Sequence, residues 1–207
     1  MMIGKSDGPT AVTVIKKNSK LTWKQKFEKC KYKIKRAYVE HTIKDKSHSL
    51  DEVIDYIINK HGFVEIDNDE VHFERDELRA SFIMQYAPEL LGEYATMPPL
   101  KSESREDIEA HMKQFQIRKQ RAEEVPVSEF DIEFHKFQIS FDDINDNMYI
   151  IIEKRFDYIG GGVSGDKKQM RRFHRIFKDV HRYYGVTAED IKNKSKRYEQ
   201  VIRALSR

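Results

Sequence analysis

Apolar residues recur every three or four positions in six stretches of the sequence, which is the spacing of one face of an α-helix. The first stretch begins at Thr22, and its apolar row is predicted to be buried while the opposite face is almost entirely lysine. This row comprises Trp23, Phe27, Cys30, Ile34, Tyr38 and His41. The second helix is predicted to begin at a capping box, Ser49–Glu52, and to end at His61-Gly62. Its buried face comprises Leu50, Val53, Ile54, Ile57 and Ile58.

Four further helices follow from the same spacing. The third is predicted to end before Pro88, and the fourth, residues 105–124, has an apolar stripe too narrow for a central core helix. The fifth is predicted to end at Gly185, and the last to begin at the capping residue Thr187. The inward positions are Leu78, Phe82 and Tyr86 in the third helix, Ile108, Met112 and Phe115 in the fourth, Met170, Phe173, Phe177, Val180 and Tyr184 in the fifth, and Ile191, Tyr198, Ile202 and Leu205 in the last.

Alternating apolar residues predict short strands between these helices. Residues 10–15 form one β-branched run, and residues 63–66 and 70–73 are predicted to pair as a hairpin. A second hairpin is predicted from residues 132–141, with a bulge near His135, and a return strand that begins at Met148, continues to Tyr158 and ends at Gly160-Gly161-Gly162.

Together these elements predict an α+β fold in which helices pack against small antiparallel β-hairpins, because helices and strands do not alternate regularly. The chain is predicted to form a single domain over residues 1–207, with an internal linker near residues 92–104 that is rich in glycine, proline and serine.

Composition narrows the class of protein. Hydrophobic residues make up 39% of the 207 residues, which is enough for a sizeable core, and the net charge is only +3. That charge balance does not by itself imply nucleic acid or an acidic membrane as a partner. The single cysteine, Cys30, cannot form an internal disulfide, and neither a secretory signal nor an apolar stretch of about 18 residues is found. The sequence therefore predicts a cytoplasmic protein without integral membrane contact.

The most distinctive string is Gly4-Lys5-Ser6-Asp7-Gly8-Pro9-Thr10, which resembles the G-x-x-D-G-P-T segment of sodium-ion-translocating decarboxylase β subunits. With Tyr183–Ile191, it resembles short soluble bacterial proteins that are labelled as that subunit. The motif residues are Asp7, Gly8, Pro9 and Thr10. The resemblance implies a relation to these short proteins and not to the membrane pump. Because one carboxylate in water holds sodium poorly, we expect no specific sodium site at Asp7. The motif also suits a turn that launches a strand.

A glycine-rich segment precedes the fifth helix. Gly160, Gly162 and Gly165 fit the pattern G-x-G-x-x-G between a strand and a helix, where glycines let the backbone approach a phosphate. The predicted anion site adds the basic residues Lys167, Lys168, Arg171 and Arg172. A dinucleotide fold is not predicted, because the strand belongs to an antiparallel hairpin and no strand with a terminal acid follows. A flexible surface loop without a ligand is the alternative.

The first helix carries a second basic surface. Residues 16–36 contain ten basic residues and one acid, Glu28. If the chain binds a polyanion, the face predicted to contact it comprises Lys24, Lys31 and Lys35. The alternatives are a solvated helix face, attraction to the acidic stretch 51–77, and contact with an anionic membrane through Trp23 and Phe27.

Candidate catalytic and metal chemistry is sparse. His174 and His181 are separated by two helical turns, which is not the spacing of a zinc pair, and Cys30 is predicted to be a core thiol. No metal, cofactor or catalytic constellation is therefore predicted. The leading interpretation is a non-catalytic binding or regulatory module with a protein partner. The runner-up is a nucleic-acid or phosphate-ligand binder that uses its basic helices, and an enzyme acting at the glycine segment is third.

Overall fold

The computed structural model describes residues 22–207, except residues 68, 101, 103 and 142–145. The described chain divides into two compact units. The predicted single domain over residues 1–207 stays a prediction. Unit 1 contains Asp67–Phe134, and unit 2 contains the described residues up to Ile66 together with His135–Arg207. The predicted linker near residues 92–104 lies inside unit 1 and does not separate the two units.

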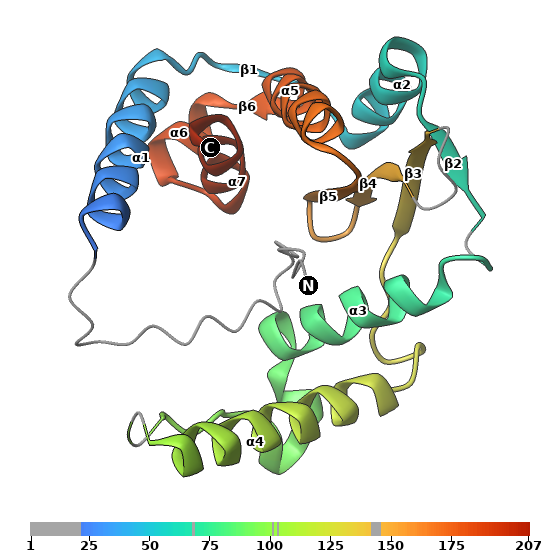
Figure 1. The fold of residues 1–207 in the computed structure, drawn as a ribbon. Coiled ribbons are helices and arrows are strands. Elements are labelled where there is room, and N and C mark those ends of the chain that lie inside the picture. Colours follow the sequence, from blue (N-terminus) through green and yellow to red (C-terminus); the bar gives the residue numbers. More distant parts are fainter. Residues whose placement is uncertain (1–21, 68, 101, 103, 142–145) are drawn as a thin grey trace. The chain divides into compact units, whose positions relative to one another are not determined.

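Unit 1 is helical (Figure 1). It comprises α3 (His72–Tyr86), the 3-10 helix η1 (Pro88–Tyr94) and α4 (Arg105–Glu124). As predicted, α3 ends before Pro88, because the residue that precedes a proline is disfavoured in the helical conformation. The predicted bounds of α4 are confirmed, and the Ser104 side chain caps it by accepting a hydrogen bond from the Asp107 amide.

A buried arginine holds the end of unit 1 in place. Arg79 of α3 is only 3% exposed. Its Nε donates to the carbonyl oxygen of Phe130 at 2.8 Å, and its guanidinium also donates to the carbonyl oxygen of Val125. The segment that follows α4 is therefore fastened to α3 by a charged donor on two backbone acceptors.

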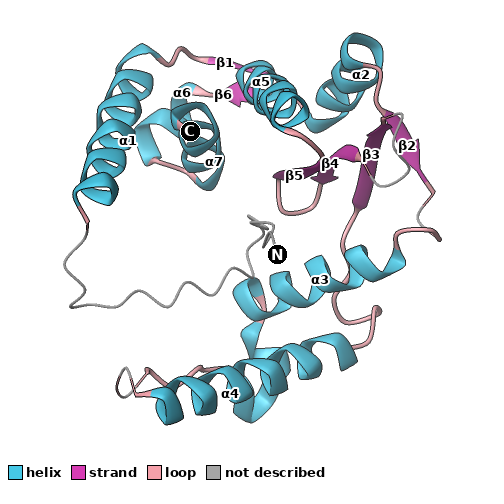
Figure 2. Ribbon diagram, viewed as in Figure 1, coloured by secondary structure: helices cyan, strands magenta, loops and turns pink. Residues whose placement is uncertain are grey.

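Unit 2 combines two antiparallel sheets with helices, which confirms the predicted α+β class (Figure 2). The larger sheet has the order β2 (Val64–Ile66), β3 (Phe134–Ser140), β4 (Asn147–Glu153) and β5 (Tyr158–Ser164). The smaller sheet pairs β1 (Lys46–Ser47) with β6 (Gly185–Val186). The helices are α1 (Trp23–Thr42), α2 (Leu50–His61), α5 (Lys167–Tyr184), α6 (Ala188–Asn193) and α7 (Lys196–Ser206).

Both predicted hairpins require correction, and the predicted strand at residues 10–15 lies outside the described residues. In the first hairpin only β2 is a strand. It pairs with β3, as Val64 opposite Gln138 shows, while residues from His72 onward form α3. In the second predicted hairpin, the return strand ends at Glu153. The Glu153 carboxylate accepts hydrogen bonds from the amides of Arg155 and Phe156 in the turn that follows. The glycines then lie in a further strand, β5, instead of a loop.

The core of unit 2 lies between the larger sheet and the inner faces of α2, α5 and α7. The predicted inward positions of these helices are largely confirmed, with Ile57, Val180 and Ile202 completely buried. Two are wrong: Ile58 is 37% exposed and Met170 is 43% exposed. The predicted caps are confirmed at Ser49, Thr187 and Gly185.

The prediction for α1 is wrong about which face of the helix is buried. Its apolar row faces outward, and Trp23, Phe27, Ile34 and Tyr38 are 84%, 60%, 66% and 69% exposed. Cys30 is also exposed and is not a core thiol. The helix is attached through its opposite side, where Arg36 forms an ion pair with Glu199 of α7 at 2.7 Å and Val39 packs against the core. Periodicity shows which side of a helix is apolar, but not which side a neighbour covers.

A buried histidine in α5 makes the stability of unit 2 depend on pH. Burial lowers the pKa of His181 to about 4, despite its hydrogen bond with the Phe177 carbonyl oxygen. The unfolded imidazole titrates near pH 6.5, so between these values only the unfolded chain takes up the proton. This contribution is complete above about pH 6.5 and decreases as the pH falls toward about 4.

We expect this proton linkage to cost about 3 kcal/mol of unfolding free energy between pH 7 and pH 4. Urea unfolding of wild type and of His181→Gln at both pH values measures it, because other titrating groups contribute equally to the two proteins. His174→Gln is the control, since His174 is exposed on the same helix. An equal loss of stability in wild type and His181→Gln would contradict the assignment.

Candidate anion-binding groove

Two glycines of the predicted anion site lie in a strand and not in a loop. Gly160 and Gly162 lie inside β5, where they pair with Ile151 and Tyr149 of β4. A Cβ atom at Gly160 would meet the ring of Tyr158, and one at Gly162 would meet the ring of Tyr149. These glycines therefore make room for tyrosine rings and not for a phosphate. Gly165 lies at the turn into α5, with a φ of +145°.

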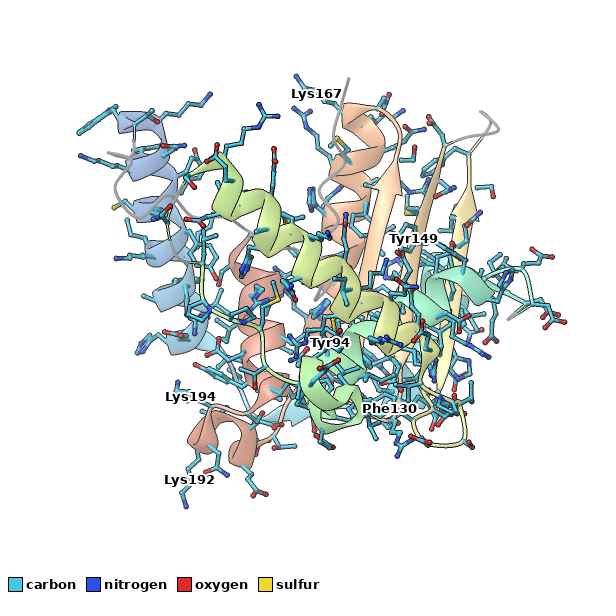
Figure 3. The ribbon with its side chains drawn as sticks, turned by 90° about the horizontal axis from the view of Figure 1, so that it is seen from below. Tyr94, Phe130, Tyr149, Lys167, Lys192 and Lys194 are labelled. Atoms are coloured by element: carbon cyan, nitrogen blue, oxygen red, sulfur yellow. The ribbon has the colours of Figure 1, made fainter. Side chains whose placement is uncertain are left out.

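The start of α5 is already capped by the protein itself. The Asp166 side chain accepts hydrogen bonds from the amides of Lys168 and Gln169 at 2.7 and 2.8 Å. These amides are the groups that would bind a phosphate at a helix N-terminus. An anion at Lys167, which is labelled at this end of α5 in Figure 3, would compete with the Asp166 carboxylate. The structure therefore gives no support to a compact phosphate site here.

A row of cations runs along the outer face of α5 instead. We call it the α5 seam, and it comprises Lys168, Arg171, Arg175, Lys178 and Arg182. Its members are spaced three or four residues apart, so they line one side of the helix. The opposite side carries the buried residues Phe173, Val180 and Tyr184. In the described part of the chain, no side chain of the seam forms an ion pair or a hydrogen bond.

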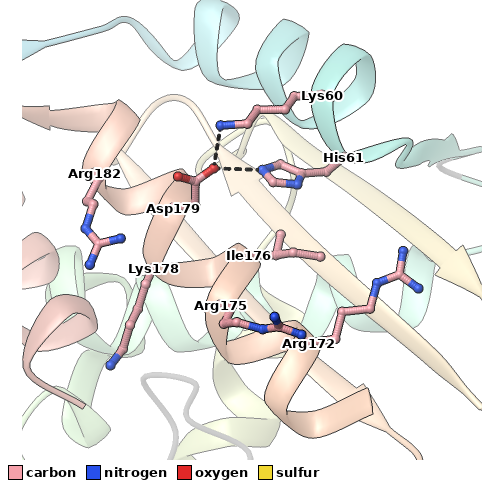
Figure 4. Close-up of a pocket in the computed structure, with 8 residues that line it drawn as sticks. All are labelled: Lys60, His61, Arg172, Arg175, Ile176, Lys178, Asp179 and Arg182. Atoms are coloured by element: carbon pink, nitrogen blue, oxygen red, sulfur yellow. Dashed lines mark hydrogen bonds and ion pairs between the residues drawn. The ribbon is translucent and has the colours of Figure 1, made fainter. Parts of the chain in front are cut away.

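The second half of the seam opens onto a groove of about 590 Å³ between α5 and the end of α2 (Figure 4). The lining residues are Lys60, His61, Arg172, Arg175, Ile176, Lys178, Asp179 and Arg182. Six of these eight side chains are basic and one is acidic. Volumes of roughly 300–1,000 Å³ are usual for small-molecule sites, so the groove has room for a phosphate-bearing group.

The one acid of the groove is engaged within the protein. Asp179 Oδ2 accepts hydrogen bonds from Lys60 Nζ and Tyr56 Oη, both at 2.9 Å, and lies 3.1 Å from His61 Nε2. Burial raises the pKa of Asp179, but the hydrogen bonds from Lys60 and Tyr56 outweigh it and lower the pKa overall. The carboxylate therefore stays ionised, joins α2 to α5, and leaves the seam cations uncompensated.

The end of the seam meets the first helix. Burial lowers the pKa of Lys178, and the positive charges of Lys35 and Arg182 lower it further. Lys35 belongs to the predicted polyanion face, and it lines a second groove with Lys178 and Arg182 between α1, α5 and α7. The end of the α5 seam therefore meets the predicted polyanion face at Lys35. Lys24 and Lys31 lie farther along α1 and are exposed.

Most of the groove was absent from the predicted sites. Arg172 was predicted as part of the glycine site and lines the groove, and Lys168 and Arg171, predicted with it, begin the seam. Arg175, Lys178 and Arg182 continue it at the same helical spacing, which was a readable signal in the sequence. Lys60 could not be predicted from helical spacing, because only the packing of α2 against α5 brings it to the groove.

The resemblance to decarboxylase β-like proteins rests on two segments. Asp7, Gly8, Pro9 and Thr10 lie outside the described residues. The other segment, Tyr183–Ile191, covers the end of α5, β6 and the start of α6. No family model, curated protein or solved structure matches this chain. The interpretation of the groove therefore depends on its own geometry.

Neither a metal site nor a membrane span is found among the described residues. No three histidine, cysteine or acidic side chains among them come together as a metal site. None of the described helices combines the length and the apolar character that a membrane span requires.

Proposed function

We propose that unit 2 is a non-catalytic binding module that holds a phosphate-rich polyanion, with nucleic acid as the class of ligand. The observation that carries this proposal is the α5 seam, with five cations in one row and no counter-ion among the described residues. From Lys168 to Arg182 the row extends about 21 Å, because an α-helix rises about 1.5 Å per residue. An extended phosphate backbone presents charges over such a length, whereas a compact phosphate does not.

Several cations of unit 2 have acidic partners, whereas no cation of the seam pairs with a described residue. The chain has 35 acidic residues for 38 lysines and arginines. Arg36 pairs with Glu199, and Lys154 pairs with Asp51 at 2.6 Å. A cationic row that is left without such partners repels itself, and an external anion relieves that repulsion. Phosphate contacts of this kind position a ligand without reading its sequence.

A protein segment rich in carboxylates is the second candidate ligand. A protein partner was the leading interpretation of the sequence, and a carboxylate-rich segment of such a partner would also neutralise the seam. The relation to decarboxylase β-like proteins stays a prediction, and it does not decide between these ligands.

We expect neutralisation of the seam to weaken nucleic-acid binding. The test variant combines Arg171→Gln, Arg175→Gln and Lys178→Gln. The slope of log affinity against log salt should become shallower by about 0.9 for each duplex phosphate contact that is lost. Affinity in dilute salt should fall by roughly 10- to 100-fold for both a short DNA duplex and a single strand. Fluorescence anisotropy of labelled oligonucleotides between about 50 and about 200 mM salt measures both quantities.

A matched control removes the same charge elsewhere. It combines Lys113→Gln, Lys192→Gln and Arg203→Gln, three exposed positions outside the seam, of which Lys192 is labelled in Figure 3. Binding should then stay near the wild-type value. Equal weakening by both variants, or no binding by wild type in dilute salt, would contradict the proposal. Tight binding to polyglutamate in place of nucleic acid would favour the acidic protein partner.

A further inference from the structure

The outward face of α1 differs in kind from the α5 seam. Its centre is an apolar row, Trp23, Phe27, Ile34 and Tyr38, with Cys30 between Phe27 and Ile34. These residues recur at spacings of three or four, so they form one continuous strip along the helix. The opposite side of α1 attaches to unit 2 through Arg36 and Val39. The strip is therefore left uncovered by the part of the chain that the structure describes.

Lysines border this strip on both sides. At 3.6 residues per turn, Lys24, Lys31 and Lys35 lie along one edge, and Lys26, Lys29 and Lys33 lie along the other. Glu28 is the only acid between Trp23 and Arg36. Among the described residues, no lysine from Lys24 to Lys33 forms an ion pair or a side-chain hydrogen bond.

The positions of the cations relative to the apolar residues differ between α1 and α5, and this difference indicates which class of partner each helix suits. On α5 the cations occupy the centre of the exposed face, which suits a line of phosphates. On α1 the centre is apolar and the cations flank it, which suits a flat surface with an apolar interior and anionic groups at its level. A helix with these features lies in the plane of a membrane interface, and tryptophan and tyrosine are enriched at that depth.

We propose that α1 docks on an anionic lipid surface. Trp23, Phe27 and Ile34 enter the boundary between headgroups and acyl chains, and the flanking lysines contact the lipid phosphates and carboxylates. The helix has 20 residues, and its charges restrict it to the surface, in agreement with the absence of a membrane-spanning helix among the described residues. This inference goes beyond the proposed function, because it uses a different helix and a different ligand.

Trp23 provides a direct probe, since it is the only tryptophan and is 84% exposed. We expect its emission to shift to shorter wavelength with vesicles of one part phosphatidylserine to two parts phosphatidylcholine. Vesicles of phosphatidylcholine alone should leave the emission unchanged.

The double variant Phe27→Ser with Ile34→Ser should lower the affinity for the anionic vesicles by roughly 10- to 100-fold. Lys24→Gln, Lys31→Gln and Lys33→Gln together should lower it on the order of 100-fold, at about 1 kcal/mol for each charge near the surface.

The control removes two other exposed apolar side chains. Val64→Ser with Phe73→Ser changes residues that are 65% and 66% exposed and lie outside α1, so vesicle binding should be preserved. Circular dichroism verifies that each variant is folded. The proposal is overturned if Trp23 shows no shift, if the control variant loses binding equally, or if neutral vesicles bind equally well. It is also overturned if Phe27→Ser with Ile34→Ser dissociates a dimer and leaves vesicle binding intact.

The two proposals fail independently. Phe27→Ser with Ile34→Ser should leave oligonucleotide binding at the wild-type level, because neither residue belongs to the α5 seam. If that variant weakens oligonucleotide binding and has no effect on vesicles, the exposed strip serves nucleic acid and the lipid proposal is wrong.

Discussion

Replacing Gly185 with alanine is expected to destabilise unit 2 by about 4 kcal/mol, which is near the upper end for single substitutions. Gly185 ends α5 with φ at +61° and ψ at −161°, a combination that side-chain-bearing residues rarely adopt. A Cβ atom there would also overlap the carbonyl oxygen of Lys46 in the neighbouring strand β1. Both backbone strain and a steric clash therefore oppose the substitution.

Gly62→Ala is the matched control for this prediction. Gly62 ends α2 with φ at +74°, but a Cβ atom there would have no other heavy atom within 4 Å. Its substitution should therefore carry only the left-handed penalty of about 1 kcal/mol. Urea unfolding followed by circular dichroism, with hydrogen exchange of β4 and β5 as a local measure, compares the two. Similar losses for both variants would show that β1 does not restrict Gly185.

The difference between these two glycines illustrates what the sequence could predict. Both were predicted to end helices, and both do, because a glycine after an apolar helical pattern is a local signal. The capping box at Ser49 and the capping residue Thr187 were predicted correctly for the same reason. The contact of Gly185 with β1 joins segments that are far apart in the sequence, so no local pattern reports it.

The errors have the same origin. Residues 63–66 and 70–73 have the spacing of a hairpin, but the partner of β2 is β3, about 70 positions away in the chain. The apolar row of α1 has the spacing of a core face, but α7 packs on the other side of the helix. In several of these regions local periodicity predicted the helix or the strand correctly. Tertiary packing decided which neighbour each helix or strand contacts, and local periodicity does not report that.

The candidate site shows the same difference between what local sequence patterns predict and what tertiary packing decides. The cationic spacing of α5 is present in the sequence: two of the predicted anion-site residues, Lys168 and Arg171, begin a row of cations that continues to Arg182. The glycine motif was misleading, because Gly160 and Gly162 accommodate the rings of Tyr158 and Tyr149. A short glycine pattern has several structural causes, of which phosphate binding is only one.

Replacing Arg79 with methionine is expected to destabilise unit 1 by about 4 kcal/mol and to leave unit 2 folded. The substitution preserves much of the buried side-chain volume but removes the donors to the carbonyl oxygens of Phe130 and Val125. Each buried polar group that loses its partner costs about 1–3 kcal/mol, and the bonds to a charged donor are the stronger kind. The segment after α4 should detach from α3 first.

Hydrogen exchange measured peptide by peptide in the full chain tests this prediction. Amides of α3 and α4 should lose protection in Arg79→Met, while those of α5 and α7 should exchange as in wild type, because the two units are compact separately. Arg105→Met is the control: Arg105 is an exposed arginine of α4 whose ion pair with Glu109 lies at the surface, so it should change protection little. Equal loss of protection in both units would show that they unfold together. Unchanged protection of α3 and α4 would show that Arg79 does not hold the segment after α4.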